Sequence, residues 1–264
     1  MCHLAVWIYY ISFLIIMSNY YKNPEVLTVF GYEVYFTRFA DSIIKDHFQD
    51  ALSDLEKVLE EFQITEAQLI SAGGGLSSIT QNLRDKLYEH NWEKINIESE
   101  HKVREKVLTS ESHEIDHYKE FGKGNIGLEI EWNNKDPFFD RDLENFRKLH
   151  QLGELTLGII ITRGESLQQE LIEVYKRFLN DIYPYSIEQL SEKLSLSQKA
   201  SARISNMVSF DREESVAAIA RLLCSSKYGT STTHMQKLTT RMDRGVGDPC
   251  PCVLIGIGKE RISA

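Results

Sequence analysis

Three acidic residues in the middle of the chain have the types and spacing that hydrolytic chemistry needs. Glu129 and Glu131 lie in a segment whose alternate positions are apolar, namely Ile126, Leu128, Ile130 and Trp132. This period-2 pattern predicts a β-strand over 125–132, so both glutamates should point to one side, about 7 Å apart along the chain. Asp116 lies in a shorter predicted strand, 113–118, and antiparallel pairing of the two strands would bring its carboxylate to the same edge.

Three carboxylates that converge at the end of a sheet form a site for a hard divalent cation, for which Mg²⁺ fits best. Such a site suits hydrolysis of a phosphodiester. The cation neutralises charge that develops on the phosphate and lowers the pKa of the attacking water, while a spare carboxylate takes the proton. A simpler interpretation remains open on the pattern alone, in which Glu-x-Glu is only the solvated face of a strand.

The elements around these acids predict an α/β fold. Asp136 as the N-cap and Pro137 as the first helical residue begin a helix that Gly153 ends. An apolar strand is predicted over 155–162 and a helix over 165–179. The order strand, strand, helix, strand, helix favours a central sheet flanked by helices.

Weaker patterns predict the rest of the chain. The apolar stripe Ile44, Phe48, Leu52, Leu55, Leu59 and Phe62 predicts one long amphipathic helix. Ser78 with Gln81 reads as a capping box for a helix that ends near Asn91, after a flexible turn at 73–75. Further helices are predicted over 187–194, 214–224 and 232–242, with a last strand over 253–257. Because no linker divides the chain, we expect a single domain over 17–264.

The segment that follows the first glutamate is similar to a known signature. The run from Glu129 to Leu143, EIEWNNKDPFFDRDL, resembles the signature of the BglII/BamHI-type type II restriction endonucleases. Residues 113–116, 158–163 and 73–75 fit the same resemblance, as does the segment from Lys227 to His234. The likeness spans roughly residues 70 to 257.

This resemblance implies the restriction-endonuclease-like fold of the PD-(D/E)xK superfamily, a central mixed sheet flanked by helices. It also implies a cytoplasmic enzyme that cuts double-stranded DNA at a short palindromic site as a homodimer. Asp116 and Glu129 would hold Mg²⁺ with the backbone carbonyl of Ile130. Glu131 stands where most of the superfamily has Lys, and in the BamHI-like branch it is assigned to the water or to proton transfer. Ile115 stands where the motif has Pro, so the identity of the general base stays open.

Residues just after the Glu-x-Glu strand are the predicted readers of DNA sequence. In related enzymes this segment enters the major groove, where Asn can pair with adenine and Arg or Lys with guanine. The candidates are Asn133, Asn134, Lys135, Asp136 and Arg141. Asp136 has an alternative role as the helix cap, and Lys135 could equally hold a phosphate.

A second group of candidates for DNA contact lies further along the chain. The segment 227–244 combines hydroxyl groups and cations that suit phosphate contacts, although it could equally be a solvated helix with its capping loop. Its candidates are Lys227, Thr232, Thr233 and His234. Arg163, at the end of an apolar strand, is a further expected DNA-facing residue.

Composition limits the classes of protein that the chain can represent. Its 264 residues include 30 basic and 39 acidic residues, a formal net charge of −9, which excludes a basic protein that coats nucleic acid. A local patch can still bind DNA, because affinity depends on where charges lie. Eight carboxylates against two lysines fall within 41–66 and predict a solvated helix face. The hydrophobic fraction of 42% is enough for a sizeable core and excludes disorder.

Residues 1–16 form an apolar extension without a charged side chain. It lacks the features of a secretory signal and is marginal as a membrane span. We interpret it as translated sequence ahead of a natural start at Met17 or as a buried helix, with a membrane anchor as a third reading. This extension leaves a membrane-tethered interaction protein as one competing function, although we expect no stable membrane association. Glu131 in the place of the usual Lys leaves another, a DNA-binding module without catalysis.

Overall fold

A computed structural model of the chain describes residues 21–22, 30–71, 77–208 and 211–263. The predicted apolar extension, 1–16, and the predicted turn at 73–75 lie outside the described residues. No helix in the described ranges is long and apolar enough to cross a membrane.

The centre of the structure is a seven-stranded mixed sheet with the order β1-β2-β8-β7-β6-β5-β4. Strands β6, β7 and β8 are parallel to one another, while β2 and β5 flank them in antiparallel fashion. The strands are β1 Tyr21–Lys22, β2 Tyr32–Phe36, β4 Glu93–Val103, β5 Lys106–Phe121, β6 Gly124–Glu131, β7 Leu157–Arg163 and β8 Cys252–Ile257. The predicted α/β fold with a central mixed sheet is confirmed.

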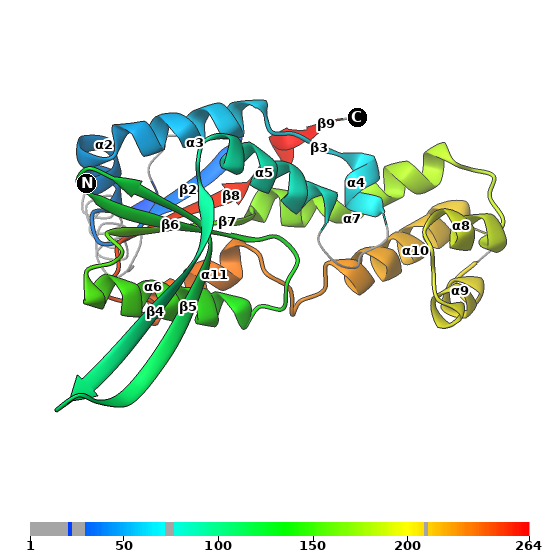
Figure 1. The fold of residues 1–264 in the computed structure, drawn as a ribbon. Coiled ribbons are helices and arrows are strands. Elements are labelled where there is room, and N and C mark those ends of the chain that lie inside the picture. Colours follow the sequence, from blue (N-terminus) through cyan, green and yellow to red (C-terminus); the bar gives the residue numbers. More distant parts are fainter. Residues whose placement is uncertain (1–20, 23–29, 72–76, 209–210, 264) are drawn as a thin grey trace, which may run out of the picture.

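Helices cover both faces of this sheet (Figure 1). One core joins the sheet to α2 Ala40–His47, α3 Gln49–Glu61, α5 Ser78–Glu89, α7 Glu165–Asp181 and α10 Arg212–Lys227. The second core lies under α6 Phe138–Leu152 and α11 Met235–Asp243. Shorter elements are β3 Ile64–Thr65, α4 Glu66–Ile70, α8 Ile187–Lys193, α9 Gln198–Ser205, η2 Lys259–Arg261 and β9 Ile262–Ser263.

Strand β6 is buried on both faces, which corrects the expectation of a strand with one solvated face. Ile126, Leu128 and Ile130 belong to the first core, and the glutamates between them point to the side covered by α6. Parallel strands are normally covered by helices on both sides, because the crossover connections place helices there. The Glu-x-Glu pattern is therefore not the wet face of this strand.

The predicted long helix over residues 44–62 is instead two helices. Phe48, with φ −129° and ψ 47°, separates α2 from α3. Both helices still bury the predicted apolar stripe, because Ile44, Phe48, Leu55, Leu59 and Phe62 are all at most 2% exposed. The hydrophobic period was read correctly, but periodicity carries no signal for a one-residue break in the backbone.

Four predicted helix starts are also wrong by one to three residues, among them that of α10, which begins at Arg212 and not at residue 214. The cap of α5 is Ser77, whose hydroxyl accepts from the Thr80 N–H, so the predicted capping box at Ser78 does not form. Helix α6 begins at Phe138 without a side-chain cap, so Asp136 is not the N-cap. Helix α11 begins at Met235, because Thr232 pairs with Lys135 in an isolated β-bridge.

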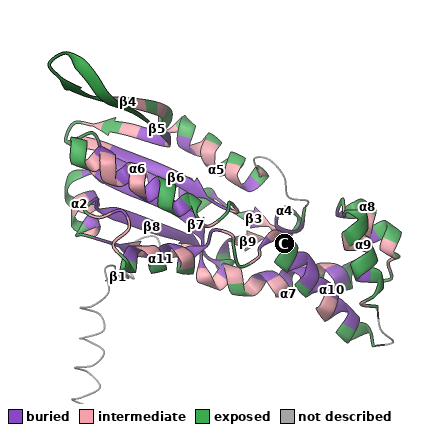
Figure 2. Ribbon diagram, turned by 90° about the horizontal axis from the view of Figure 1, so that it is seen from below, coloured by how far each residue is buried: buried purple, intermediate pink, exposed green. Residues whose placement is uncertain are grey.

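Strands β4 and β5 extend beyond the sheet as a long two-stranded ribbon (Figures 1 and 2). The sequence predicts only residues 113–118 of β5 and no part of β4, because the ribbon is exposed and lacks apolar alternation. Its turn residues Arg104 and Glu105 have φ of 49° and 68°. Left-handed backbone costs roughly 1–2 kcal/mol for each residue that has a side chain.

Gly158 on β7 allows α6 to lie close to the sheet. A Cβ at this position would overlap the ring carbons of Phe146, which packs in the core beneath α6. We expect Gly158→Ala to lower the free energy of unfolding by about 1–3 kcal/mol, because the ring must leave its rotamer or α6 must shift. Urea denaturation measures this, with Gly122→Ala as the control, since a Cβ there meets nothing within 4 Å. Equal stability of the two variants would contradict the overlap.

Candidate active site

Strand pairing brings Asp116 beside Glu129. The antiparallel pairing of β5 with β6 ends at His117, opposite Leu128, and Asp116 and Glu129 are the next residues of the two strands. The backbone N–H of Asp116 lies 3.3 Å from Oε1 of Glu129 and donates to it. Glu131 lies at the carboxyl end of β6, the edge at which open α/β sheets bind their ligands.

A fourth acid, Asp142 on α6, joins this group and was missed in the sequence. Its carboxylate is fully buried, and Glu129 and Glu131 are only 3% and 2% exposed. The side chain of Asp116, in contrast, is 47% exposed. A signal for Asp142 exists in hindsight, since it lies three residues after Phe139 on the apolar face of an amphipathic helix, where a charged residue is out of place.

One arginine and one amide serve these buried carboxylates. Nη2 of Arg141 lies 2.7 Å from Oδ1 of Asp142 and 3.6 Å from Oε1 of Glu131. The side-chain amide of Asn134 donates to Oε2 of Glu131 at 2.8 Å. At the exposed end, Nζ of Lys94 lies 3.6 Å from Oδ1 of Asp116. The guanidinium of Arg141 thus lies beside two of the three buried carboxylates, those of Glu131 and Asp142.

Burial and mutual repulsion raise the pKa of all three buried carboxyl groups. Burial is the largest cause for Glu129, Glu131 and Asp142, and for both glutamates the charge of Asp142 comes next. Oδ2 of Asp142 is buried without a hydrogen-bond donor. The contact between the carboxyl groups of Glu131 and Asp142 raises the pKa of Glu131 and lowers that of Asp142.

The donor chemistry of the group suits a hard divalent cation. Carboxylate oxygens are the ligands that Mg²⁺ prefers, and added positive charge would relieve the repulsion that raises these pKa values. In the described part of the chain, no group of three or more His, Cys, Asp or Glu side chains is arranged to hold a metal ion. Mg²⁺ is commonly held by one or two carboxylates together with substrate phosphate oxygens, so a closed protein cage is not required.

The two segments expected to read DNA lie against each other. Lys135 and Thr232 form a β-bridge, the Asp136 N–H donates to the Ser231 carbonyl at 2.8 Å, and the Thr233 N–H donates to the Asn134 carbonyl at 2.9 Å. Contacts between residues nearly a hundred positions apart therefore build one surface. Asn134 and Lys135 are exposed on it, as is Arg141, while Asn133, Asp136 and Thr232 are half-buried.

Arg163 does not face outward as the sequence suggested. Its guanidinium is fully buried and donates to the Trp132 carbonyl, to Asn133 Oδ1 at 3.0 Å, and to Thr232 Oγ1 at 2.8 Å. Nε donates to Gln168 Oε1 at 3.0 Å. A buried guanidinium needs partners for its donors, and these bonds tie the segment after β6 to the segment after α10.

Other residues of the second candidate group are also held inside the protein. Nζ of Lys227 donates to the carbonyls of Gln68, Leu69 and Ser71 at 2.6–3.3 Å, and burial lowers its pKa to about 8. Thr233 is fully buried and His234 is 7% exposed. Lys227, Thr233 and His234 therefore support the surface rather than form it.

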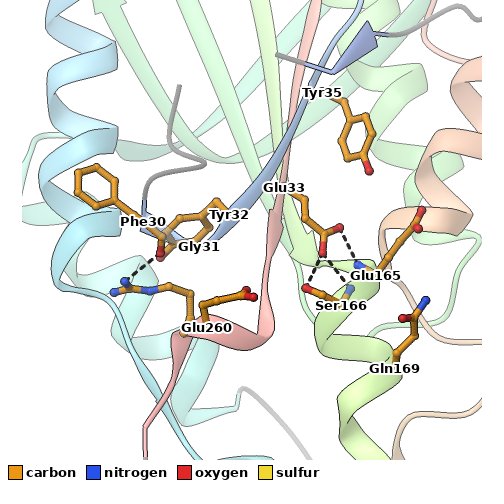
Figure 3. A pocket seen from close by; sticks show the side chains of 10 residues that line it. Phe30, Gly31, Tyr32, Glu33, Tyr35, Glu165, Ser166, Gln169 and Glu260 are labelled. Carbon is orange, nitrogen blue, oxygen red and sulfur yellow. Dashed lines mark hydrogen bonds between the residues drawn. The ribbon is translucent and has the colours of Figure 1, made fainter. Parts of the chain in front are cut away.

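A separate pocket of about 760 Å³ lies between β2, the start of α7 and residues 260–261 (Figure 3). In this pocket, the carboxylate of Glu33 accepts hydrogen bonds from the N–H groups of Glu165 and Ser166, both at 2.8 Å, and from the Ser166 hydroxyl at 2.7 Å. The positive end of the α7 dipole is thereby neutralised from within the chain. None of the acids around Glu129 lines this pocket.

The hydroxyl of Thr232 is the acceptor most easily removed from Arg163. We expect Thr232→Val to lower the free energy of unfolding by about 1–3 kcal/mol, because it leaves a donor of a buried cation unsatisfied. Chemical denaturation measures the loss, and Thr232→Ser, which keeps the hydroxyl, should restore most of it. Thr240→Val is the matched control, since the Thr240 hydroxyl donates only to the Gln236 carbonyl one turn back. If Thr232→Val costs no more than Thr240→Val, Arg163 does not depend on this bond.

The raised pKa of Glu131 predicts a pH dependence of stability. The folded protein keeps a proton that the unfolded chain releases, so the contribution of Glu131 is present below about pH 4 and is lost as pH rises through its raised pKa. Relative to the metal-free wild type, Glu131→Gln should therefore gain stability with rising pH. Burial lowers the pKa of His117 to about 4, so His117 contributes to the pH dependence of stability with the opposite sign. This contribution cancels in the difference between the variant and the wild type, because both proteins contain His117.

Urea midpoints of both proteins at several pH values between about 5 and 9 measure the difference. Glu120→Gln, at an exposed position of β5, is the control. A constant offset between Glu131→Gln and the wild type across this range would contradict a protonated Glu131.

Comparison with known proteins gives a family for this geometry. The family model described as restriction endonuclease BglII/BglIII matches residues 32–257, which is most of the chain and includes every acid of the site. No curated protein matches the chain. The chain therefore belongs to the BglII/BglIII restriction endonuclease family.

Proposed function

We propose that the protein is a type II restriction endonuclease that hydrolyses phosphodiester bonds of double-stranded DNA with Mg²⁺. The observation that carries the proposal is the placement of Asp116 beside Glu129. Glu131 lies two residues further along β6, and the exposed Asn134 donates a hydrogen bond to it. Carboxylates and a DNA-facing amide then share one sheet edge. Membership of the family supports the nuclease chemistry.

Asp116 and Glu129 are the proposed ligands of Mg²⁺, together with the backbone carbonyl of Ile130. When bound, the cation neutralises charge on the scissile phosphate and lowers the pKa of the attacking water. Asp116 is the half-exposed member of the group, so a DNA phosphate can approach from its side. The buried Glu129 is held in orientation by the Asp116 N–H.

Glu131 is the residue best placed to move a proton. Without added positive charge it holds a proton against Asp142, and a positive charge nearby lowers its pKa so that it becomes an acceptor. Asn134 fixes Oε2 of Glu131 by donating to it, and Arg141 balances the charge that Glu131 and Asp142 then share. Proton acceptance from water at Glu131 follows from this arrangement.

Recognition of DNA is proposed for the surface formed by the two joined segments. Asn134, Lys135 and Arg141 are exposed and reach outward, with the half-buried Asn133, Asp136 and Thr232 behind them. Asn and Arg side chains suit adenine and guanine edges, and Lys135 suits a phosphate. Arg163, Lys227, Thr233 and His234 hold this surface in shape.

We further propose that residues 17–264 form one nuclease domain that acts in the cytoplasm as a homodimer. One sheet edge supplies one set of carboxylates, so two copies related by a two-fold axis are needed to cut both strands of a palindromic site. The symmetry of such a site matches the symmetry of an isologous dimer.

Plasmid digestion tests this proposal. With Mg²⁺ the wild-type protein should yield discrete fragments, and Glu129→Ala should lower the cleavage rate at least about 10³-fold, since a lost cation ligand removes several kcal/mol of transition-state stabilisation. Binding of the same DNA, measured by mobility shift without divalent cation, should be largely retained. Glu120→Ala, an exposed position on the neighbouring strand β5, is the matched control and should cut normally.

Two outcomes would reject the catalytic assignment. Retained cleavage by Glu129→Ala would remove that residue from the metal site. Specific binding by the wild type with no strand scission in Mg²⁺ would instead favour a DNA-binding module that lacks catalysis.

A further inference from the structure

The outer part of the ribbon formed by β4 and β5 is a structural feature that the catalytic site does not use. From the pairing of His101 with Thr109, it continues as two strands to the pair Val103 and Lys106 and is exposed on both faces (Figure 2). A two-stranded hairpin has marginal stability in water when nothing packs on it. Its length is therefore unexplained by the packing of the protein itself.

The tip of the ribbon has an unusual turn. A two-residue connection with positive φ at both positions is a type I′ turn, in which Asn and Gly are strongly preferred. This ribbon places Arg104 and Glu105 there instead, at φ of 49° and 68°. Strained backbone that persists at an exposed tip indicates that the side chains are kept for a purpose other than stability.

Charge distinguishes the tip from the stem. In the stem, Glu111 pairs with Lys148, Glu114 with Lys94, and Glu100 with Lys102, at 2.6–2.7 Å in each case. These ion pairs neutralise three carboxylates of the stem. At the tip, Arg104 and Lys106 flank Glu105, so the end of the ribbon carries excess positive charge in a chain with a formal net charge of −9.

The shape of the ribbon suits double-stranded DNA. A two-stranded β-ribbon has the width that the major groove accepts, and cations at its tip meet phosphates on either side. The same strand carries Asp116, about 10 residues from the tip, or roughly 33 Å if fully extended, so the tip is too far from the site for the bases that are cut. Contact would fall on flanking DNA.

We propose that the β4–β5 ribbon is a second DNA-binding element, in which Arg104 and Lys106 contact the phosphate backbone outside the recognition site. This inference rests on the proposed function, since it assumes that DNA is the substrate. The contact adds affinity without sequence information, because phosphates carry none.

The test is the double variant Arg104→Asn with Lys106→Gln. Asn tolerates a positive φ, so the turn is preserved and thermal unfolding should occur at no lower temperature than in the wild type. Fluorescence anisotropy with a labelled 40-base-pair duplex, without divalent cation, measures affinity at several salt concentrations. We expect at least about 10-fold weaker binding at low salt and a salt slope reduced by about 1.8, which corresponds to two lost phosphate contacts. The control Lys123→Gln, at the exposed turn between β5 and β6, should bind as the wild type does.

Unchanged affinity and salt slope in the double variant would overturn the inference. So would a loss of affinity that accompanies a shift from dimer to monomer in sedimentation velocity without DNA, because the ribbon would then contact a second copy of the chain. Failure of the proposed function is a separate result, namely absence of cleavage by the wild type in Mg²⁺, and it leaves the binding measurement intact.

Discussion

The burial of three carboxyl groups beside one guanidinium is the constraint on which the rest of the site depends. Glu129, Glu131 and Asp142 are withdrawn from water, and Arg141 lies close to Glu131 and Asp142. Ionising all three carboxyl groups is unfavourable in such surroundings, so their pKa values are raised. A cation beside these carboxyl groups would offset the free-energy cost of burying them, which fits a family of DNA-cleaving enzymes.

A buried guanidinium, that of Arg163, organises the surface proposed to face DNA. Arg163 joins Trp132 and Asn133 to Thr232, and the backbone bonds between 134–136 and 231–233 complete the connection. Asn134 belongs to this surface and also bonds to Glu131. The segments proposed to face DNA are therefore in direct contact with Glu131, the residue proposed to move the proton.

Local patterns in the sequence predicted much of the fold. Strands β6, β7 and β8 and helices α6 and α7 follow from apolar period and length, and antiparallel pairing of the two acid-bearing strands places Asp116 beside Glu129. What the patterns missed depends on long-range contacts. The break at Phe48, the bridge at Thr232 and the buried state of Arg163 are decided by partners distant in the chain, and Asp142 looked like an ordinary helix residue. The ribbon was missed because exposed strands lack the apolar alternation that reveals buried ones.

The position of β8 within the sheet has a consequence for biosynthesis. Residues 252–257 insert between β2 and β7, which are separated by more than a hundred residues of intervening chain. Until the ribosome has delivered that segment, the sheet remains divided into two parts with open edges at its centre. A growing chain therefore lacks the continuous scaffold behind its acidic residues.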